Sequence, residues 1–303
     1  MSKLAKFFII CAAVCVVGIV MTFAGYAAGG VDDLQKVAEK HKWLNVGPNS
    51  TETNLITVGE FRSIEAEGSL DIVVIAPGKE MDEEAVPNFV EDMYYGGTAG
   101  TVAVRWGKGS DVPEVTNENG VLKINGSAES IDTAQVNLTG EDPSPDVVVF
   151  CPDDELESIN INGKYGDNAI VCVRSKSTKV TAESGDIEIE DMEGGRIEAE
   201  TETGDIYADD IAGSEMTLKA GTGDIDISGC AGEISAETTT GDIEFATTLP
   251  QSSFETDLSV NTGEISVNEE SVDSKEFHAK GEPNKLLCRT DTGDIDADFG
   301  EAR

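Results

Sequence analysis

Six acidic residues recur in the C-terminal half of the chain, each inside the same short phrase, and a regular row of them could bind divalent cations. The phrase reads Ser/Thr-Gly-Asp-Ile, with Glu for Asp in one copy, and its acidic members are Asp186, Asp205, Asp224, Asp242, Glu264 and Asp294. Carboxylate oxygens are ligands that calcium prefers. If the copies stack as paired strands, neighbouring carboxylates lie roughly 4.8 Å apart, where two unit charges repel by about 0.9 kcal/mol even in water.

Two arrangements would offset that repulsion. In the first, Ser and Thr hydroxyls and free turn amides bind each carboxylate, and salt screens the remainder. In the second, a row of calcium ions lies between the carboxylates. The calcium-binding nonapeptide pattern G-G-x-G-x-D is absent from the chain, which favours the first arrangement. The sequence therefore predicts no cofactor, with calcium as the alternative.

Side chains suited to catalysis are sparse. The two histidines are His41, close to an apolar N-terminal run, and His278, between the last two copies of the phrase. Neither belongs to a Ser/His/Asp pattern or to a cysteine and histidine cluster with metal-ligand spacing. A pair of carboxylates does not indicate a catalytic site in a chain with 59 acidic residues. The sequence predicts a protein that is not an enzyme.

Four cysteines follow the apolar N-terminal run, and they are Cys151, Cys172, Cys230 and Cys288. The sequence separation of Cys151 and Cys172 is close to one repeat. One interpretation is a disulfide between adjacent repeats. The other is burial of both residues as small apolar side chains.

The glycines of the phrase set its period, and they are Gly185, Gly204, Gly223, Gly241, Gly263 and Gly293. Their spacing is nearly constant over the first four and lengthens over the last two. Periods of roughly 20 residues are typical of solenoids, and glycine suits a corner because it adopts positive φ at little cost. Between corners, apolar residues alternate with polar ones, as in Met216, Leu218 and Ala220. This period of two predicts two short strands in each unit of about 19 residues.

The predicted fold is all-β, a β-solenoid of stacked two-strand coils that follows one N-terminal transmembrane helix. One coil cannot bury its apolar side alone, whereas stacked coils bury a continuous core. Residues 181–303 form the regular repeat region. Residues 55–180 hold less periodic strands, for example at 70–75 and 146–150, and form the irregular N-terminal part that caps the stack and protects its edge.

Aromatic residues gather in one part of this N-terminal region. Residues 79–98 are acidic and irregular, which predicts a surface loop, and they contain Tyr94 and Tyr95. Trp106 follows in the next strand. These three side chains could form a platform for a sugar or a protein partner, or they could simply pack.

The N-terminus is typical of a membrane anchor. Residues 7–31 contain no charged residue, Lys3 and Lys6 precede them, and Asp32 and Asp33 follow. About 20 apolar residues span a bilayer as a helix, and preceding basic residues keep residues 1–6 in the cytoplasm and the bulk of the chain outside. The alternative is a signal peptide that is cleaved near Ala27, which would give a secreted protein. Residues 32–54 form a juxtamembrane stalk or linker.

Charge excludes one class of function. The formal net charge is −38, from 59 acidic and 21 basic residues. Phosphate would be repelled, so a nucleic-acid partner is not expected. The regular apolar alternation argues against disorder despite the acidity.

These features together resemble a known family. An apolar span, then the run Val148-Val149-Phe150-Cys151-Pro152, then serial Thr-Gly-Asp-Ile repeats look like the bacterial adhesin-like, β-strand-repeat family of unknown function. The resemblance covers roughly residues 55–299. It implies a β-solenoid on the bacterial envelope and supplies no established catalytic residues. Glu264 and the long last interval depart from the repeat, so the register of the final coils stays open.

The sequence thus predicts a non-enzymatic, membrane-anchored, extracytoplasmic protein with an adhesion or scaffolding role. Its partners would be the membrane, through residues 7–31, and a cell-wall component, a glycan or a membrane protein. One alternative is an envelope-stress sensor that acts through a membrane partner. Another is a surface rod that binds cations along the acidic row.

Overall fold

The structure, a computed structural model, describes residues 44–45, 51–76, 97–107, 112–126, 136–137, 146–152 and 155–300. The chain divides into two compact units. In the first, residues 1–50 and 131–143, the strands β1 (Leu44–Asn45) and β8 (Val136–Asn137) pair in parallel. The predicted span at residues 7–31 lies outside the described residues, within which no helix has the length and apolarity to cross a bilayer.

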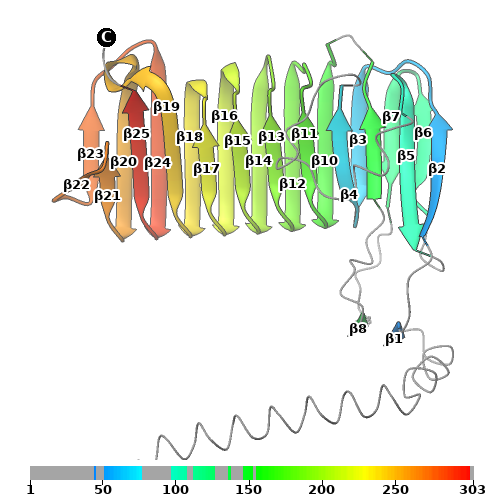
Figure 1. Ribbon diagram of the computed structural model, residues 1–303, viewed down its shortest axis with the longest axis horizontal. Helices are drawn as coiled ribbons and strands as arrows, with labels where there is room; N and C mark the ends of the chain where they lie inside the picture. Colours follow the sequence, from blue (N-terminus) through cyan, green and yellow to red (C-terminus); the bar gives the residue numbers. More distant parts are fainter. Residues whose placement is uncertain are drawn as a thin grey trace, which may run out of the picture. The chain divides into compact units, whose positions relative to one another are not determined.

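The second unit, residues 51–130 and 144–303, consists of two sheets that pack face to face (Figure 1). The 11-stranded sheet has the spatial order β23 (Glu276–Ala279), β20 (Phe254–Thr262), β24 (Asn284–Thr292), β18 (Ala231–Thr240), β16 (Ala212–Thr222), β14 (Arg196–Thr203), β12 (Ser177–Ser184), β10 (Ser158–Tyr165), β3 (Ser63–Gly68), β7 (Val121–Asn125) and β6 (Glu114–Glu118). The 12-stranded sheet has the order β2 (Thr51–Thr57), β5 (Thr101–Gly107), β9 (Asp146–Phe150), β4 (Asp71–Ile75), β11 (Asn168–Val171), β13 (Ile187–Glu190), β15 (Ile206–Asp209), β17 (Ile225–Ser228), β19 (Ile243–Pro250), β25 (Ile295–Gly300), β21 (Ile265–Val267) and β22 (Glu270–Val272).

Each repeat unit forms one coil, with one strand in each sheet, and strands of neighbouring coils pair in parallel. The isoleucine of the repeated phrase shows why the units stack. Ile187, Ile206, Ile225, Ile243, Ile295 and Ile265 are successive partners across the 12-stranded sheet, and each is fully buried. Burying one such side chain contributes about 1.5–3 kcal/mol. The predicted all-β fold with stacked two-strand coils is confirmed.

The last coils are not stacked in chain order. Strands β24 and β25 lie between the coil of β18 and β19 and the coil of β20 and β21 (Figure 1). The chain therefore builds the outermost coil first, at residues 254–267, and then returns to insert residues 284–300 beneath it. This detour explains why the last two intervals of the repeat are long, and it gives the register of the final coils that the sequence left open.

Both ends of the stack close with antiparallel strands, which protects the exposed coil edges. At one end, β2 pairs with β5 and β6 pairs with β7. The side-chain amide of Asn117 in β6 donates to the carbonyls of Val58 and Glu60, both at 2.9 Å. At the other end, β23 and β22 fold back on β20 and β21. The 3-10 helix η1 (Gln251–Ser253) leads into β20.

Aromatic rings fill the core near the C-terminal end. The rings of Phe245, Phe254 and Phe299 lie 5.4–5.6 Å apart between centroids. At the other end, Phe61 is buried. The first strand of this unit begins at Thr51, slightly before the predicted start at Leu55.

Candidate functional site

The repeated glycines occupy corners where a side chain cannot fit. Gly223, for example, has φ of +146°, and a Cβ atom there would lie 2.0 Å from the carbonyl oxygen of Gly204 on the preceding coil. The same close approach recurs at Gly185, Gly204, Gly241, Gly263 and Gly293, with φ between +136° and +148°. Positive φ and stacking at this distance together explain why the phrase keeps glycine.

The acidic residues of the phrase form one row along the stack, linked by hydrogen bonds. The main-chain N–H of each donates to the Oδ1 atom of the residue one coil before, over 2.7–2.9 Å. In spatial order the row is Asp71, Asp167, Asp186, Asp205, Asp224, Asp242, Asp294 and Glu264. We call this row the aspartate ladder.

The ladder accounts for the one glutamate in the phrase. Glu264 lies on the outermost coil, where no further described amide donates to its carboxylate. An aspartate, whose short side chain places Oδ1 beside the N–H of the next coil, is needed only where another coil follows. Asp294, which the sequence order places last, lies inside the ladder and keeps aspartate.

The ladder offsets part of its own repulsion. Burial raises the pKa of Asp186, the hydrogen bond from the Asp205 N–H lowers it, and the carboxylates of Asp167 and Asp205 raise it, so that the net shift is upward. Among the described residues, no three cysteine, histidine or acidic side chains gather in a cluster that could hold a metal ion. Calcium binding along the ladder stays a prediction.

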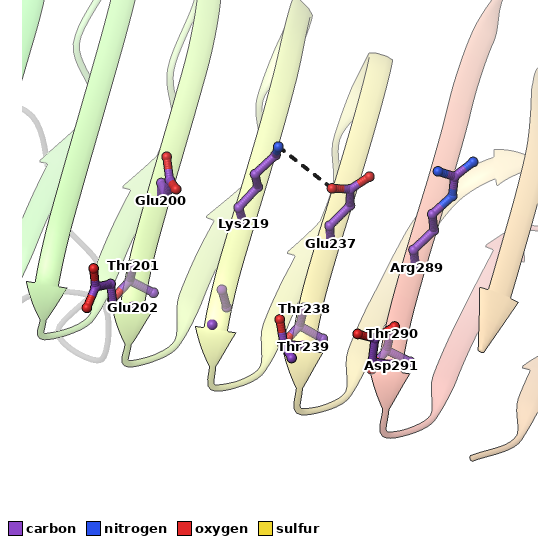
Figure 2. Close-up of a pocket in the computed structure, with 12 residues that line it drawn as sticks. Glu200, Thr201, Glu202, Lys219, Glu237, Thr238, Thr239, Arg289, Thr290 and Asp291 are labelled. Carbon is purple, nitrogen blue, oxygen red and sulfur yellow. Dashed lines mark ion pairs between the residues drawn. The ribbon is translucent and has the colours of Figure 1, made fainter. Parts of the chain in front are cut away.

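A polar groove of about 460 Å³ crosses four strands of the 11-stranded sheet, β14, β16, β18 and β24 (Figure 2). Its lining consists of three rows that run across the strands. The first row is Glu200, Lys219, Glu237 and Arg289, the second is Thr201, Ala220, Thr238 and Thr290, and the third is Glu202, Gly221, Thr239 and Asp291. The groove lies at the ends of these strands, beside the glycine corners.

One glycine hollows out this groove. Gly221 carries no side chain where the neighbouring strands carry glutamate, threonine or aspartate, whereas the side chain of Ala220 is buried in the main core. Gly221 cannot easily be replaced, because a Cβ atom there would lie 2.5 Å from the carbonyl oxygen of Glu202. Below the groove, the hydroxyls of Thr201, Thr238 and Thr290 donate to the carbonyls of corner glycines at 2.9–3.1 Å.

The first row of the groove alternates in charge, as Figure 2 shows. Lys219 pairs with Glu237 at 3.7 Å. Arg289 is exposed and forms no ion pair with any residue that the structure describes. Arg289 lies beside Glu237 only because β24 is inserted next to β18.

Comparison with known proteins identifies the family. The profile of the family described as Toastrack DUF4097 matches residues 82–298, well over half of the chain. The chain belongs to the Toastrack DUF4097 family. This confirms the predicted resemblance to an adhesin-like bacterial family of unknown function. No curated protein matches the sequence.

Three solved structures are similar to this Toastrack chain at low identity. A candidate cell adhesion protein from Clostridium sporogenes is 9% identical, with 83% of this chain and 99% of that chain covered and a TM-score of 0.36. A candidate adhesin from Bacteroides fragilis is 14% identical, with 82% and 97% covered and a TM-score of 0.44. A candidate adhesin from Parabacteroides merdae is 12% identical, with 85% and 98% covered and a TM-score of 0.29.

The outer faces of the two Toastrack sheets differ in charge. On the 11-stranded sheet, carboxylates pair with bases, as in Lys179 to Glu198 at 3.1 Å and Lys285 to Glu233 at 3.1 Å. On the 12-stranded sheet, strands β13, β15, β17, β19 and β25 contain no lysine or arginine. Their outward residues Glu188, Tyr207, Asp226, Glu244 and Asp296 form a single row.

Burial and neighbouring carboxylates raise the pKa of three side chains on this acidic face. Burial, followed by repulsion from Glu190, raises the pKa of Glu188 to about 7. Burial and the carboxylate of Glu244 raise the pKa of Asp226. Burial and the carboxylate of Asp205 raise the pKa of Tyr207 to about 12. Glu188 and Asp226 therefore bind a proton more readily than carboxyl groups in water do.

None of the four described cysteines of the Toastrack chain forms a disulfide with another described residue. The disulfide between Cys151 and Cys172 that the spacing allowed is not formed, because β4 lies between β9 and β11. The two residues are thus two strand spacings apart, about 10 Å, beyond the reach of a disulfide. Cys151, Cys230 and Cys288 are buried, and burial raises the pKa of Cys230 and Cys288 to about 12.

The remaining sequence candidates do not meet in one site. His278 lies on the edge strand β23, with its Nδ1 atom 3.4 Å from Asp257 and its Nε2 atom 3.8 Å from Glu276. Trp106 packs against the main core. His41, Tyr94 and Tyr95 lie outside the described residues.

Sequence reasoning missed the groove. It singled out neither Lys219 nor Arg289, because their proximity depends on the order of the coils. The sequence does contain a signal for one earlier member of the aspartate ladder. Gly166 and Asp167 precede Gly185 and Asp186 by one full repeat, and the Asp186 N–H donates to Oδ1 of Asp167.

Proposed function

We propose that this Toastrack chain is a non-enzymatic, membrane-anchored, extracytoplasmic protein of the bacterial envelope with an adhesion role, and that the groove on its 11-stranded sheet is the contact surface. The observation that carries the proposal is the groove itself. It presents carboxylates, the hydroxyl of Thr239, an ammonium group and a guanidinium group at the fixed spacing of a sheet.

The shape of the groove fits a linear polar polymer. Crossing four strands spans about 14 Å, which suits an extended glycan better than a compact small molecule. The floor at Gly221 lets a linear ligand approach the backbone. Deep burial of the ligand is not needed, because affinity would come from repeated contacts along the chain.

The polar groups of the groove suit a glycan that carries amino and carboxyl groups, as wall polymers can. Glu200, Glu202 and Asp291 would accept hydrogen bonds from hydroxyl or ammonium groups. Arg289 would donate two parallel hydrogen bonds to a ligand carboxylate, which is the strongest arrangement available to it.

Sedimentation with insoluble wall glycan tests the contact surface. Arg289→Ala should reduce the bound fraction, with affinity falling about tenfold, since a charge-assisted hydrogen bond contributes about 1.5–3 kcal/mol. Arg196→Ala is the matched control, because Arg196 lies on the same sheet face outside the groove and pairs with Glu198 and Glu215. Equal losses in both variants, or no binding by the native protein, would remove the groove as the contact surface.

The anchor rests on the charge-free run at residues 7–31. A C-terminal tag on the chain should pellet with membranes and be digested by protease added to intact cells. A tag that is found in the medium would instead indicate cleavage near Ala27, and a tag that survives in intact cells would contradict the proposed orientation.

A further inference from the structure

The two large sheets end in four edge strands, and β2 is the least protected of them. β22 and β23 are three and four residues long, and β6 is five residues long with a glutamate at each end. β2 runs for seven residues in unbroken register with β5, and its sequence contains no lysine, no proline and one charged residue, Glu52. Soluble proteins usually protect an edge by shortness, charge, proline or a bulge. The length and composition of β2 therefore favour pairing with a further strand.

β2 is also the strand that extends furthest at its end of the stack (Figure 1). Beyond the coil of β10 and β11, the 12-stranded sheet continues through β4, β9, β5 and β2, whereas the 11-stranded sheet continues only through β3, β7 and β6. The 12-stranded sheet is thus longer by one strand at this end. A partner strand can therefore approach the outer edge of β2 without meeting β6.

The hydrogen-bond pattern shows which main-chain groups face that outer edge. The N–H of Val58 donates to the carbonyl of Gly100, just before β5, at 3.0 Å. Alternate residues of an antiparallel strand bond to the same neighbour, so the even-numbered residues of β2 face β5. The N–H and C=O groups of Thr53, Leu55 and Thr57 then point away from β5, where no described strand pairs with them. These three residues present a row of main-chain donors and acceptors at the edge.

The side chains of the same three residues are exposed and symmetrically arranged. Ile56 and Val58 pack against the main core, so the side chains of Thr53, Leu55 and Thr57 lie on the outward face of the sheet. All three are exposed, Leu55 by 48%. One threonine on either side of the leucine makes the row symmetrical about Leu55. A two-fold interface needs this self-complementarity, because the same surface supplies both sides.

We propose that β2 pairs with β2 of a second copy of this chain, in an antiparallel register centred on Leu55. Leu55 then lies opposite Leu55 of the second copy, and Thr53 lies opposite Thr57 of the second copy. Each of these pairs exchanges two main-chain hydrogen bonds, and the threonine pairs stabilise antiparallel strands further. The two 12-stranded sheets become one continuous sheet. This dimer leaves the groove open, because the groove lies on the other sheet.

Opposite charges at position 55 test the pairing in the full chain. Leu55→Lys and Leu55→Glu each place like charges directly opposite one another across the two-fold axis. Each variant alone should therefore dimerise with a dissociation constant at least tenfold higher than that of the native protein. An equimolar mixture of the two variants should restore the dimer, which also shows that both are folded. Ser271→Lys is the matched control, because it adds the same charge at an exposed position of β22, the opposite edge of the same sheet.

Sedimentation velocity of the full chain in detergent, over a range of protein concentrations, measures these dissociation constants. The native protein and Ser271→Lys should dimerise equally. A native protein that stays monomeric, or a dimer that persists in either variant at position 55, would overturn the proposal. A mixture of the two charged variants that stays monomeric, or an equal loss in Ser271→Lys, would overturn it as well.

Discussion

The main-chain N–H of Asp205 donates to Oδ1 of Asp186 at 2.8 Å, across two neighbouring coils. The same contact joins each further pair in the aspartate ladder. This hydrogen bond offsets part of the repulsion between neighbouring carboxylates and joins one coil to the next. Each aspartate inside the ladder accepts a hydrogen bond from a corner amide that would otherwise lack a partner.

Removing one aspartate of the ladder should therefore destabilise the stack of coils. Asp205→Ala is expected to lower the free energy of unfolding by about 1–2 kcal/mol, since it deletes a hydrogen bond to a charged acceptor. Asp205→Asn should cost less, because its amide oxygen can still accept. Glu264→Ala, at the end of the ladder, serves as the control and should change little. Denaturant unfolding measures all three, and a large effect at Glu264 would contradict the ladder.

The corner glycines should resist substitution much more than exposed turn glycines do. Gly223→Ala is expected to cost about 3 kcal/mol or more, because positive φ combines with a Cβ atom 2.0 Å from the Gly204 carbonyl oxygen. Gly120→Ala is the comparison, since its φ is +82° and its Cβ meets nothing within 4 Å. That change should cost about 1 kcal/mol. Similar losses at the two sites would mean that stacking at the corners is looser than described.

The acidic face should make stability depend on pH. The folded protein holds the Glu188 proton up to a pKa of about 7, against 4.5 as the ordinary value. The contribution of Glu188 to stability should be greatest below pH 4.5 and fall as pH rises to 7, because the unfolded chain releases this proton earlier. Asp186 and Asp226 shift in the same direction.

Glu188→Gln should therefore raise the free energy of unfolding at pH 8 by about 1–2 kcal/mol, after allowance for solvent screening, and change little at pH 4. Glu198→Gln is the control, because Lys179 lowers the pKa of Glu198, so neutralising it should not stabilise at pH 8. Melting temperatures at both pH values measure the effect. A Glu188→Gln protein that follows the native pH profile would contradict this assignment.

Cations should stabilise the protein by screening alone. The ladder amides bind the carboxylates locally, so calcium and sodium at matched ionic strength are expected to raise the melting temperature equally. EDTA should have no effect. A rise specific to calcium would instead favour the surface rod that binds cations along the ladder.

Much of the coil could be predicted, because its signals are local. The alternation around Ile206, the glycine corner and the phrase itself all lie within one repeat unit. The order of the last coils could not be predicted, since β24 has the same local pattern wherever it is inserted. Only the detour places Arg289 beside Glu237. The groove depends on that order and therefore could not be predicted from the sequence.

The same reasoning explains the cysteine correction. A sequence separation close to one repeat indicates adjacent coils only where the stack follows the chain. In the N-terminal part, β4 lies between the strands that precede Cys151 and Cys172. Departures from sequential stacking occur at both ends of the unit, where antiparallel strands close the coils.

Footprinting of the protein bound to wall glycan tests the proposed contact face most directly. Hydrogen exchange of the full chain, with and without insoluble wall glycan, would compare the two sheets in one experiment. Protection should appear at residues 219–221, 237–239 and 289–291, and not at Glu188, Asp226 or Glu244. Protection confined to the acidic face, or none on either sheet, would contradict the groove as the contact surface.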